Sequence, residues 1–122
     1  FLLVGTEKGN VFFYRAEDFS RSSIDIMWNK VVGKKYTRPG AVAILAEHPV
    51  DAAKLLISYE LGLLVLYDIV NKAMLITFDT SDLQQVTSMA WCSQTSFLTG
   101  HEDGCISTWT EEAPERMDDI EA

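Results

Sequence analysis

A short pattern of residues that is typical of a β-hairpin occurs three times along this chain. In each copy an apolar run leads into a tight turn that ends in glycine, and a second apolar run follows; the copies are 2–14, 55–67 and 97–109. Each copy also has glutamate two residues before the turn glycine and an aromatic residue five residues after it. Because copies at a regular spacing fold as stacked units, this pattern predicts a repeat protein.

The spacing of the turn glycines indicates the kind of repeat. Gly9 and Gly62 are 53 residues apart, and Gly62 and Gly104 are 42 residues apart. A period of about 40–45 residues is typical of a four-stranded propeller blade, and the longer interval accommodates a loop insertion. All three are expected to be structural turn residues, since glycine adopts the positive φ that such a reversal needs. The run 63–67 is apolar on both faces, so both faces must be covered, as they are between blades.

We therefore predict an all-β fold: a fragment of a β-propeller, with about one full and two partial four-stranded blades. The partial propeller is expected over 1–110. It would contain the end of one blade over 1–31, a full blade over 41–79 and the start of the next blade over 86–110. Residues 111–122 would form a separate segment.

Two details of this division are open to test. The outer strand of the first blade is expected at 24–28, and the outer strand of the third is expected to be missing or to lie beyond the chain. Residues 111–122 are predicted to be an acidic, solvated tail or an inter-blade segment, because six of them are acidic and Pro114 interrupts any helix. The chain begins on Phe1 without an initiator methionine, so the simplest interpretation is a piece of a longer protein.

Composition limits the partners. The formal net charge is −8, which is the wrong sign for binding nucleic acid phosphates or anionic membranes. No apolar stretch approaches the roughly 18 residues of a membrane span. Trp28, Trp91 and Trp109 are each expected on a strand at a comparable place in the repeat, packed in the core and not stacked on bases.

No residues form a pattern that supports catalysis, and we predict no enzymatic activity, metal or cofactor. Residues 101–103 (His-Glu-Asp) are consecutive, but His48 belongs to another loop, so a hydrogen-bonded turn is the favoured interpretation. Cys92 and Cys105 lack Cys-x-x-Cys spacing and are expected to be small buried side chains in a reducing, cytoplasmic location.

A basic segment is the candidate for partner binding. It contains Lys30, Lys34, Lys35 and Arg38 with no acidic residue between them. A phosphate loop is excluded, because the first glycine of that motif would fall at Trp28. Such a segment is usually only solvated, but exposed loops between blades are where propellers bind acidic partners.

Two stretches carry a resemblance to a known family. Residues 3–10 (LVGTEKGN) followed by an aromatic-rich strand, and residues 26–30 (IMWNK) followed by Pro-Gly and the hairpin LLISYELG, resemble the lethal giant larvae and tomosyn family of WD-repeat proteins. The second stretch is more similar to the tomosyn branch, the syntaxin-binding proteins. The usual Trp-Asp ending of a blade is replaced by Tyr67-Asp68 and Trp109-Thr110, which fits a divergent member.

The resemblance implies a function. It implies a non-catalytic scaffold that regulates SNARE-dependent vesicle exocytosis by binding syntaxin-type SNAREs, in the cytoplasm with peripheral association at the plasma membrane through partners. The alternatives are a cell-polarity scaffold of the lethal giant larvae type and an unrelated WD-repeat adaptor. The heptad segment through which tomosyns pair with syntaxin does not occur in these residues.

Overall fold

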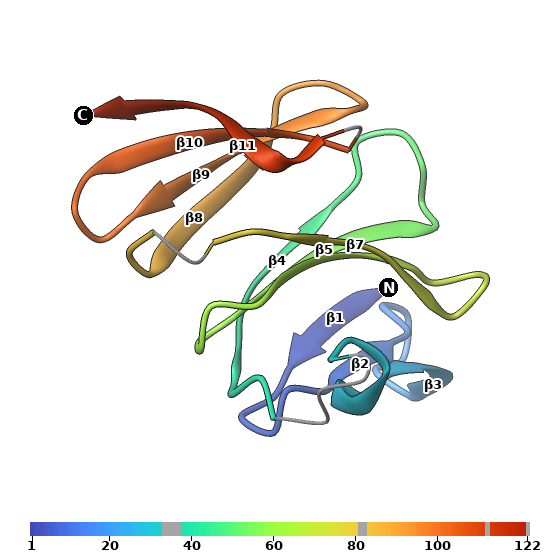
Figure 1. Ribbon diagram of the computed structural model, residues 1–122. Helices are drawn as coiled ribbons and strands as arrows, with labels where there is room; N and C mark the ends of the chain where they lie inside the picture. Colours follow the sequence, from blue (N-terminus) through green and yellow to red (C-terminus); the bar gives the residue numbers. More distant parts are fainter. Residues whose placement is uncertain (33–37, 81–82, 112, 122) are drawn as a thin grey trace.

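In the part of the chain that the computed structural model describes, the regular secondary structure is β-strand apart from one short 3-10 helix. The described residues are 1–32, 38–80, 83–111 and, for the backbone alone, 113–121. Over these residues the strands form three antiparallel sheets, one of three strands and two of four, and each sheet follows the last along the chain (Figure 1). This agrees with the predicted series of blades.

Each sheet is a simple meander in which neighbours in sequence are neighbours in space. The first contains β1 (Leu2–Gly5), β2 (Val11–Tyr14) and β3 (Arg21–Ile26), and the short 3-10 helix η1 (Trp28–Lys30) follows it. The middle sheet contains β4 (Val42–Glu47), β5 (Lys54–Tyr59), β6 (Leu64–Asp68) and β7 (Ala73–Phe78). The third contains β8 (Val86–Trp91), β9 (Ser96–His101), β10 (Cys105–Thr110) and β11 (Ala113–Glu121).

The three repeated sequence patterns form the hairpins β1–β2, β5–β6 and β9–β10. Gly9, Gly62 and Gly104 have φ values of 89°, 102° and 85°, the left-handed region in which glycine carries no steric penalty. Each turn is closed by a backbone hydrogen bond from the glycine N–H, for example from Gly104 to the His101 carbonyl at 3.0 Å. The hairpins therefore share one turn geometry.

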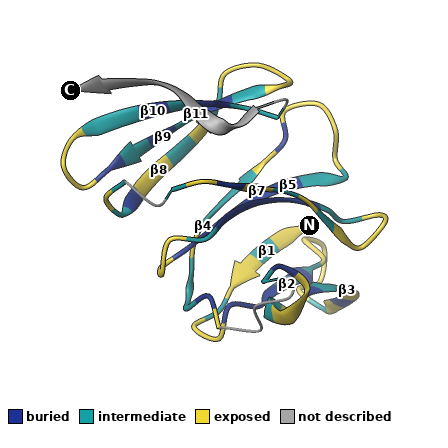
Figure 2. Cartoon of the chain, viewed as in Figure 1, coloured by how far each residue is buried: buried dark blue, intermediate teal, exposed yellow. Residues whose placement is uncertain are grey.

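The core lies between the sheets. Leu55, Ile57 and Tyr59 on β5 belong to the cluster shared with the first sheet, whereas Leu56 belongs to the cluster shared with the third. The central strands β5 and β6 are therefore buried on both faces, as the apolar run 63–67 predicts, and Figure 2 shows the buried residues in the middle sheet. Alternation of side chains along a strand explains how one sequence supplies two cores.

Direct backbone contacts also join the first two sheets. The Val42 N–H of β4 donates to the Thr6 carbonyl at 3.0 Å. At Gly5 a side chain is impossible without rearrangement, because a Cβ there would lie 2.5 Å from Val42 Cγ1. The absence of a Cβ thus allows β1 and β4 to approach closely.

The outer strand of the first sheet differs from the expected one. It covers Arg21–Ile26 and not 24–28, and Trp28 begins η1. The prediction that Trp28 lies on a strand was therefore wrong. The reason is a long-range hydrogen bond, since the Trp28 N–H donates to Asn10 Oδ1 at 2.8 Å and the chain leaves the sheet there.

The end of the chain also differs from expectation. Instead of a solvated tail, Ala113–Glu121 form β11, which pairs antiparallel with β10 with Cys105 opposite Glu121. The outer strand of the third sheet is thus present. Proline and charge, which suggested a tail, are both tolerated in an edge strand, where one side makes no ladder hydrogen bonds and charges prevent further pairing.

Candidate functional site

The predicted basic segment lies directly after β3. Lys30 ends η1 and is exposed, and Arg38 is exposed with its guanidinium carbon 5.0 Å from the centre of the Trp28 ring. Lys34 and Lys35 lie outside the described residues. The structure therefore places two of the four candidate residues, and Arg38 contacts an aromatic face in a cation–π arrangement.

A cavity of about 340 Å³ adjoins Lys30. It is lined by residues of β3 and η1 on one side and, on the other, by Tyr67, Ile69 and Lys72 from the end of β6 and the turn that follows it. Burial, with smaller contributions from Asp25 and Asp68, raises the pKa of Tyr67 above its ordinary value of 10.0. The Tyr67 hydroxyl is therefore protonated, and able to donate, at neutral pH.

Sequence reasoning missed the far side of this cavity. Three strands, β4, β5 and β6, separate Lys30 from Lys72 in the sequence, and no local pattern connects the two residues. Only the packing of the first sheet against the middle sheet brings them to one cavity. The only part of this cavity that the sequence indicated was Lys30, through its place in the basic segment.

The His-Glu-Asp turn has a structural role. His101 is buried; its Nε2 is 2.8 Å from Thr99 Oγ1, and its Nδ1 is 2.8 Å from the Gln84 carbonyl. The indole N–H of Trp109 donates to the same Thr99 oxygen at 2.9 Å. These contacts use both ring nitrogens of His101. In the part of the chain that the structure describes, no group of three His, Cys, Asp or Glu side chains is arranged to hold a metal.

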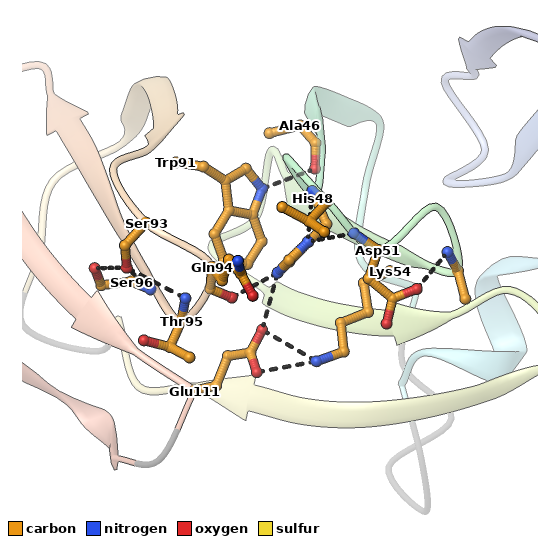
Figure 3. A network of polar contacts seen from close by, with 12 residues as sticks. Ala46, His48, Asp51, Lys54, Trp91, Ser93, Gln94, Thr95, Ser96 and Glu111 are labelled. Atoms are coloured by element: carbon orange, nitrogen blue, oxygen red, sulfur yellow. Dashed lines mark hydrogen bonds and ion pairs between the residues drawn. The ribbon is translucent and has the colours of Figure 1, made fainter.

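A second polar network joins the middle and third sheets (Figure 3). His48 Nδ1 accepts hydrogen bonds from the N–H groups of Val50 and Asp51, at 3.1 and 2.8 Å, so Nε2 carries the proton and donates to the Gln94 carbonyl. The Trp91 ring packs edge-on against the His48 ring, with centroids 4.6 Å apart. His48 is therefore buried, and its hydrogen bond connects its own loop to the neighbouring sheet.

An ion pair completes this inter-sheet network. Lys54 Nζ lies 3.1 Å from Glu111 Oε2, and their side chains are 27% and 16% exposed. His48 Nε2 lies 3.8 Å from the other oxygen of Glu111. Partial burial reduces the screening of such a pair by water and salt.

The remaining candidates from the sequence are distributed over the structure. Trp109 is buried in the second core cluster and Trp91 packs against it, whereas Trp28 is half-buried beside Arg38. Cys92 is exposed and Cys105 is half-buried, and they do not form a disulfide, so the expectation of two buried cysteines was wrong. The backbone path explains this, since Cys92 follows the last residue of β8 and lies in a turn.

The fold is that of a solved propeller. The chain superposes on the WD40 β-propeller domain of Doa1 with a TM-score of 0.72 at 12% identity, over 98% of this chain and 36% of that one. This confirms the predicted fold class: three sheets of a WD40 β-propeller. Among the described residues, no helix has the length and hydropathy that a membrane crossing requires.

Sequence comparisons give the relatives. No family model matches the chain. It is 32% identical over 119 residues to LLGL scribble cell polarity complex component 2 of Danio rerio and 33% identical over 116 residues to that of Homo sapiens. It is also 30% identical over 114 residues to Lethal(2) giant larvae protein of Drosophila pseudoobscura pseudoobscura. The chain is therefore similar in sequence to lethal giant larvae proteins.

These matches cover most of the chain but little of each relative. They include 88–89% of this chain and 10–11% of the lethal giant larvae proteins. The chain therefore spans about a tenth of the length of its curated relatives. The predicted family is supported at this level, while the expected preference for the tomosyn branch finds no support in these relatives.

Proposed function

We propose that the chain is part of a non-catalytic scaffold of the lethal giant larvae type, which organises cell polarity through protein–protein contacts. The observation that carries the proposal is 30–33% identity, over nearly the whole chain, to proteins named for cell polarity or as lethal giant larvae proteins. The function that the sequence suggested as an alternative is thus better supported than the SNARE function.

The form of the blades is consistent with a scaffold. The recurring glutamates Glu7, Glu60 and Glu102 are all exposed, and they lie in equivalent turns of the three sheets. Rigid sheets that present exposed turns at their ends provide extended surfaces for partners, and loops carry most binding functions. A cytoplasmic location, with attachment to the cell cortex through partners, is part of this proposal.

A chimera tests the proposal. Residues 1–110 would replace the matching segment of the Danio rerio relative, and the chimera would be expressed in epithelial cells that lack that protein. We expect it to localise like the parent protein and to restore apical–basal polarity. A control chimera that carries three Doa1 blades is expected to fold but not to restore polarity. If the two chimeras fold equally well and fail equally, the proposal is wrong.

The SNARE function remains a separate prediction. It would require the intact protein to co-precipitate with syntaxin, whereas two of the relatives named above are named for cell polarity and none is named for syntaxin binding. We therefore do not include syntaxin among the proposed partners.

A further inference from the structure

The cavity between the first and middle sheets has the size and position of a binding site for one side chain. Its volume of about 340 Å³ is at the lower end of the range for ligand pockets. It is formed by two separate elements, β3 with η1 and the end of β6 with its turn, so its shape depends on how the two sheets pack. Grooves between packed units are common places for ligands.

The charges around the cavity favour an anion. Lys30 and Lys72 both line it, and neither forms an ion pair with any residue that the structure describes. The one carboxylate in the lining, Asp25, is already paired, because the Arg21 guanidinium lies 3.5 Å from it. Although the chain has a net charge of −8, the lining of this cavity contains two lysines and one carboxylate and is therefore net positive.

The turn that carries Lys72 is held in place by hydrogen bonds. Asp68 accepts from the N–H groups of Val70 and Asn71 at 3.0 and 3.1 Å, and from the Asn71 side chain at 2.7 Å. Lys72 itself has a φ of 55°, a left-handed conformation that side-chain-bearing residues rarely adopt. The backbone that carries Lys72 is thus held in place, which lowers the part of the entropic cost of binding that comes from ordering this turn.

The rest of the lining is mixed. Ile24, Met27 and Ile69 supply apolar surface, and Ser23 and the protonated Tyr67 supply hydroxyl groups that can donate hydrogen bonds. An anionic group on an otherwise apolar segment fits this combination better than a free inorganic ion does. Apolar surface would cover the ligand's neighbouring carbon atoms, and the ammonium groups would bind its charge.

We propose that this cavity binds an anionic side chain of a partner peptide, a phosphorylated or carboxylate residue flanked by apolar residues, with Lys30 and Lys72 as its cationic contacts. The inference rests on the geometry of the cavity and does not depend on a role in polarity.

Fluorescence anisotropy on the intact protein tests this proposal. Three fluorescein-labelled peptides would be compared, identical except for phosphoserine, glutamate or serine between two leucines. We expect the phosphoserine peptide to bind at least about tenfold more tightly than the serine peptide, as charge-assisted hydrogen bonds would give. Binding of the glutamate peptide at similar affinity would show that a carboxylate is sufficient; a response to phosphoserine alone would identify the ligand as phosphorylated.

Substitutions test the assignment of the contacts. Lys30→Ala and Lys72→Ala are each expected to weaken phosphopeptide binding several-fold, and the double variant to remove the preference over serine. Lys8→Ala is the matched control, since Lys8 is exposed on a different turn and should leave affinity unchanged. Thermal unfolding would confirm that each variant is folded. Equal affinity for the phosphoserine and serine peptides, or a folded double variant that binds as the parent does, would overturn the proposal.

Discussion

Tyr59 and His101 occupy the same position in their repeats, three residues before the turn glycine, and their surroundings differ. His101 has partners on both ring nitrogens, one of which is Thr99. At the position that corresponds to Thr99, the middle sheet has Ile57, which has no polar atom to offer. The Tyr59 hydroxyl is buried and has no hydrogen-bond partner among the described residues. Divergence between the repeats thus removes, within the part of the chain that the structure describes, the kind of partner that His101 has in Thr99.

This difference predicts a stabilising substitution. Tyr59→Phe removes a buried hydroxyl without a partner and keeps the ring, so we expect the free energy of unfolding to rise by about 1 kcal/mol. Urea denaturation would measure it. Tyr14→Phe, at a half-buried position on β2, is the control and should change stability little. A loss of stability in Tyr59→Phe would show that the hydroxyl has a partner in solution.

The same residue predicts a dependence on alkaline pH. Burial raises the pKa of Tyr59 above its ordinary value of 10.0, with a smaller contribution from Tyr67. The neutral form is thus favoured in the folded state, so this contribution to stability is complete below about pH 10 and is lost as the pH rises further. Unfolding followed between pH 8 and 11 should show a shallower alkaline loss of stability in Tyr59→Phe than in the parent protein. Identical pH profiles would contradict this account.

At the scale of elements, the hairpin turns share a backbone conformation but not an environment. A Cβ on Gly9 would lie 2.9 Å from the Gly40 carbonyl oxygen, 3.1 Å from Pro39 Cγ and 3.2 Å from Trp28 Cβ. A Cβ on Gly104 would have no atom within 4 Å. The first turn is therefore packed against the segment that leads into the middle sheet, whereas the third turn is open.

Alanine substitutions at these two turns separate the cost of a positive φ from the cost of steric contacts. Gly104→Ala should cost about 1 kcal/mol, the penalty of a positive φ for a residue with a Cβ. Gly9→Ala should cost about 1–3 kcal/mol more, because backbone atoms must also move to make room. Thermal or urea unfolding would measure both. Equal costs would indicate that the segment 38–40 can shift freely.

One hydroxyl connects two buried side chains of the β9–β10 hairpin. Thr99 Oγ1 contacts both the Trp109 indole N–H and the His101 ring. Thr99→Val keeps the shape but leaves those groups without this partner, so we expect a loss of about 2 kcal/mol in the free energy of unfolding. Thr108→Val, half-buried on the same hairpin, is the control and should cost much less. Comparable losses in both variants would mean that the buried network is not important for stability.

At the scale of the whole molecule, the sheets are joined by two apolar interfaces and by polar contacts at their edges. Between the middle and third sheets, Phe78 packs edge-on against Phe97 and Trp109, with ring centroids 5.0 and 5.7 Å apart. The Lys54–Glu111 pair lies between the same two sheets. Aromatic packing supplies most of the attraction between the two sheets, since it buries large apolar surfaces. The ion pair favours one relative orientation of the sheets.

A double-mutant cycle tests the contribution of that ion pair. For Lys54→Ala and Glu111→Ala we expect a coupling free energy of about 0.5–1 kcal/mol, which should decrease at high salt. Arg21 and Asp25 form the matched control, because this pair lies within one strand and its side chains are 52% and 38% exposed. Its coupling should be close to zero. Equal coupling in the two pairs would show that the inter-sheet position is unimportant.

Local sequence patterns were sufficient to predict the hairpins but not to predict the cavity. Turn glycines and apolar runs are short-range signals, and they predicted the hairpins β1–β2, β5–β6 and β9–β10. The position of β3 depends on Asn10, which is 18 residues from Trp28 in sequence, and the cavity depends on two separate sheets that bring Lys30 and Lys72 into one lining. Neither arrangement leaves a periodic trace in the sequence.

The sequence by itself determined the repeat, because each hairpin is specified by a glycine at a positive φ between two apolar runs. It also determined that the middle sheet is covered on both faces. Tertiary structure alone decided which side chains meet between sheets, that the acidic end pairs as β11, and that His48 and Glu111 contact the neighbouring sheet. The physical reason is distance along the chain: turns and alternation are set within a few residues, whereas contacts between sheets depend on how complete sheets pack.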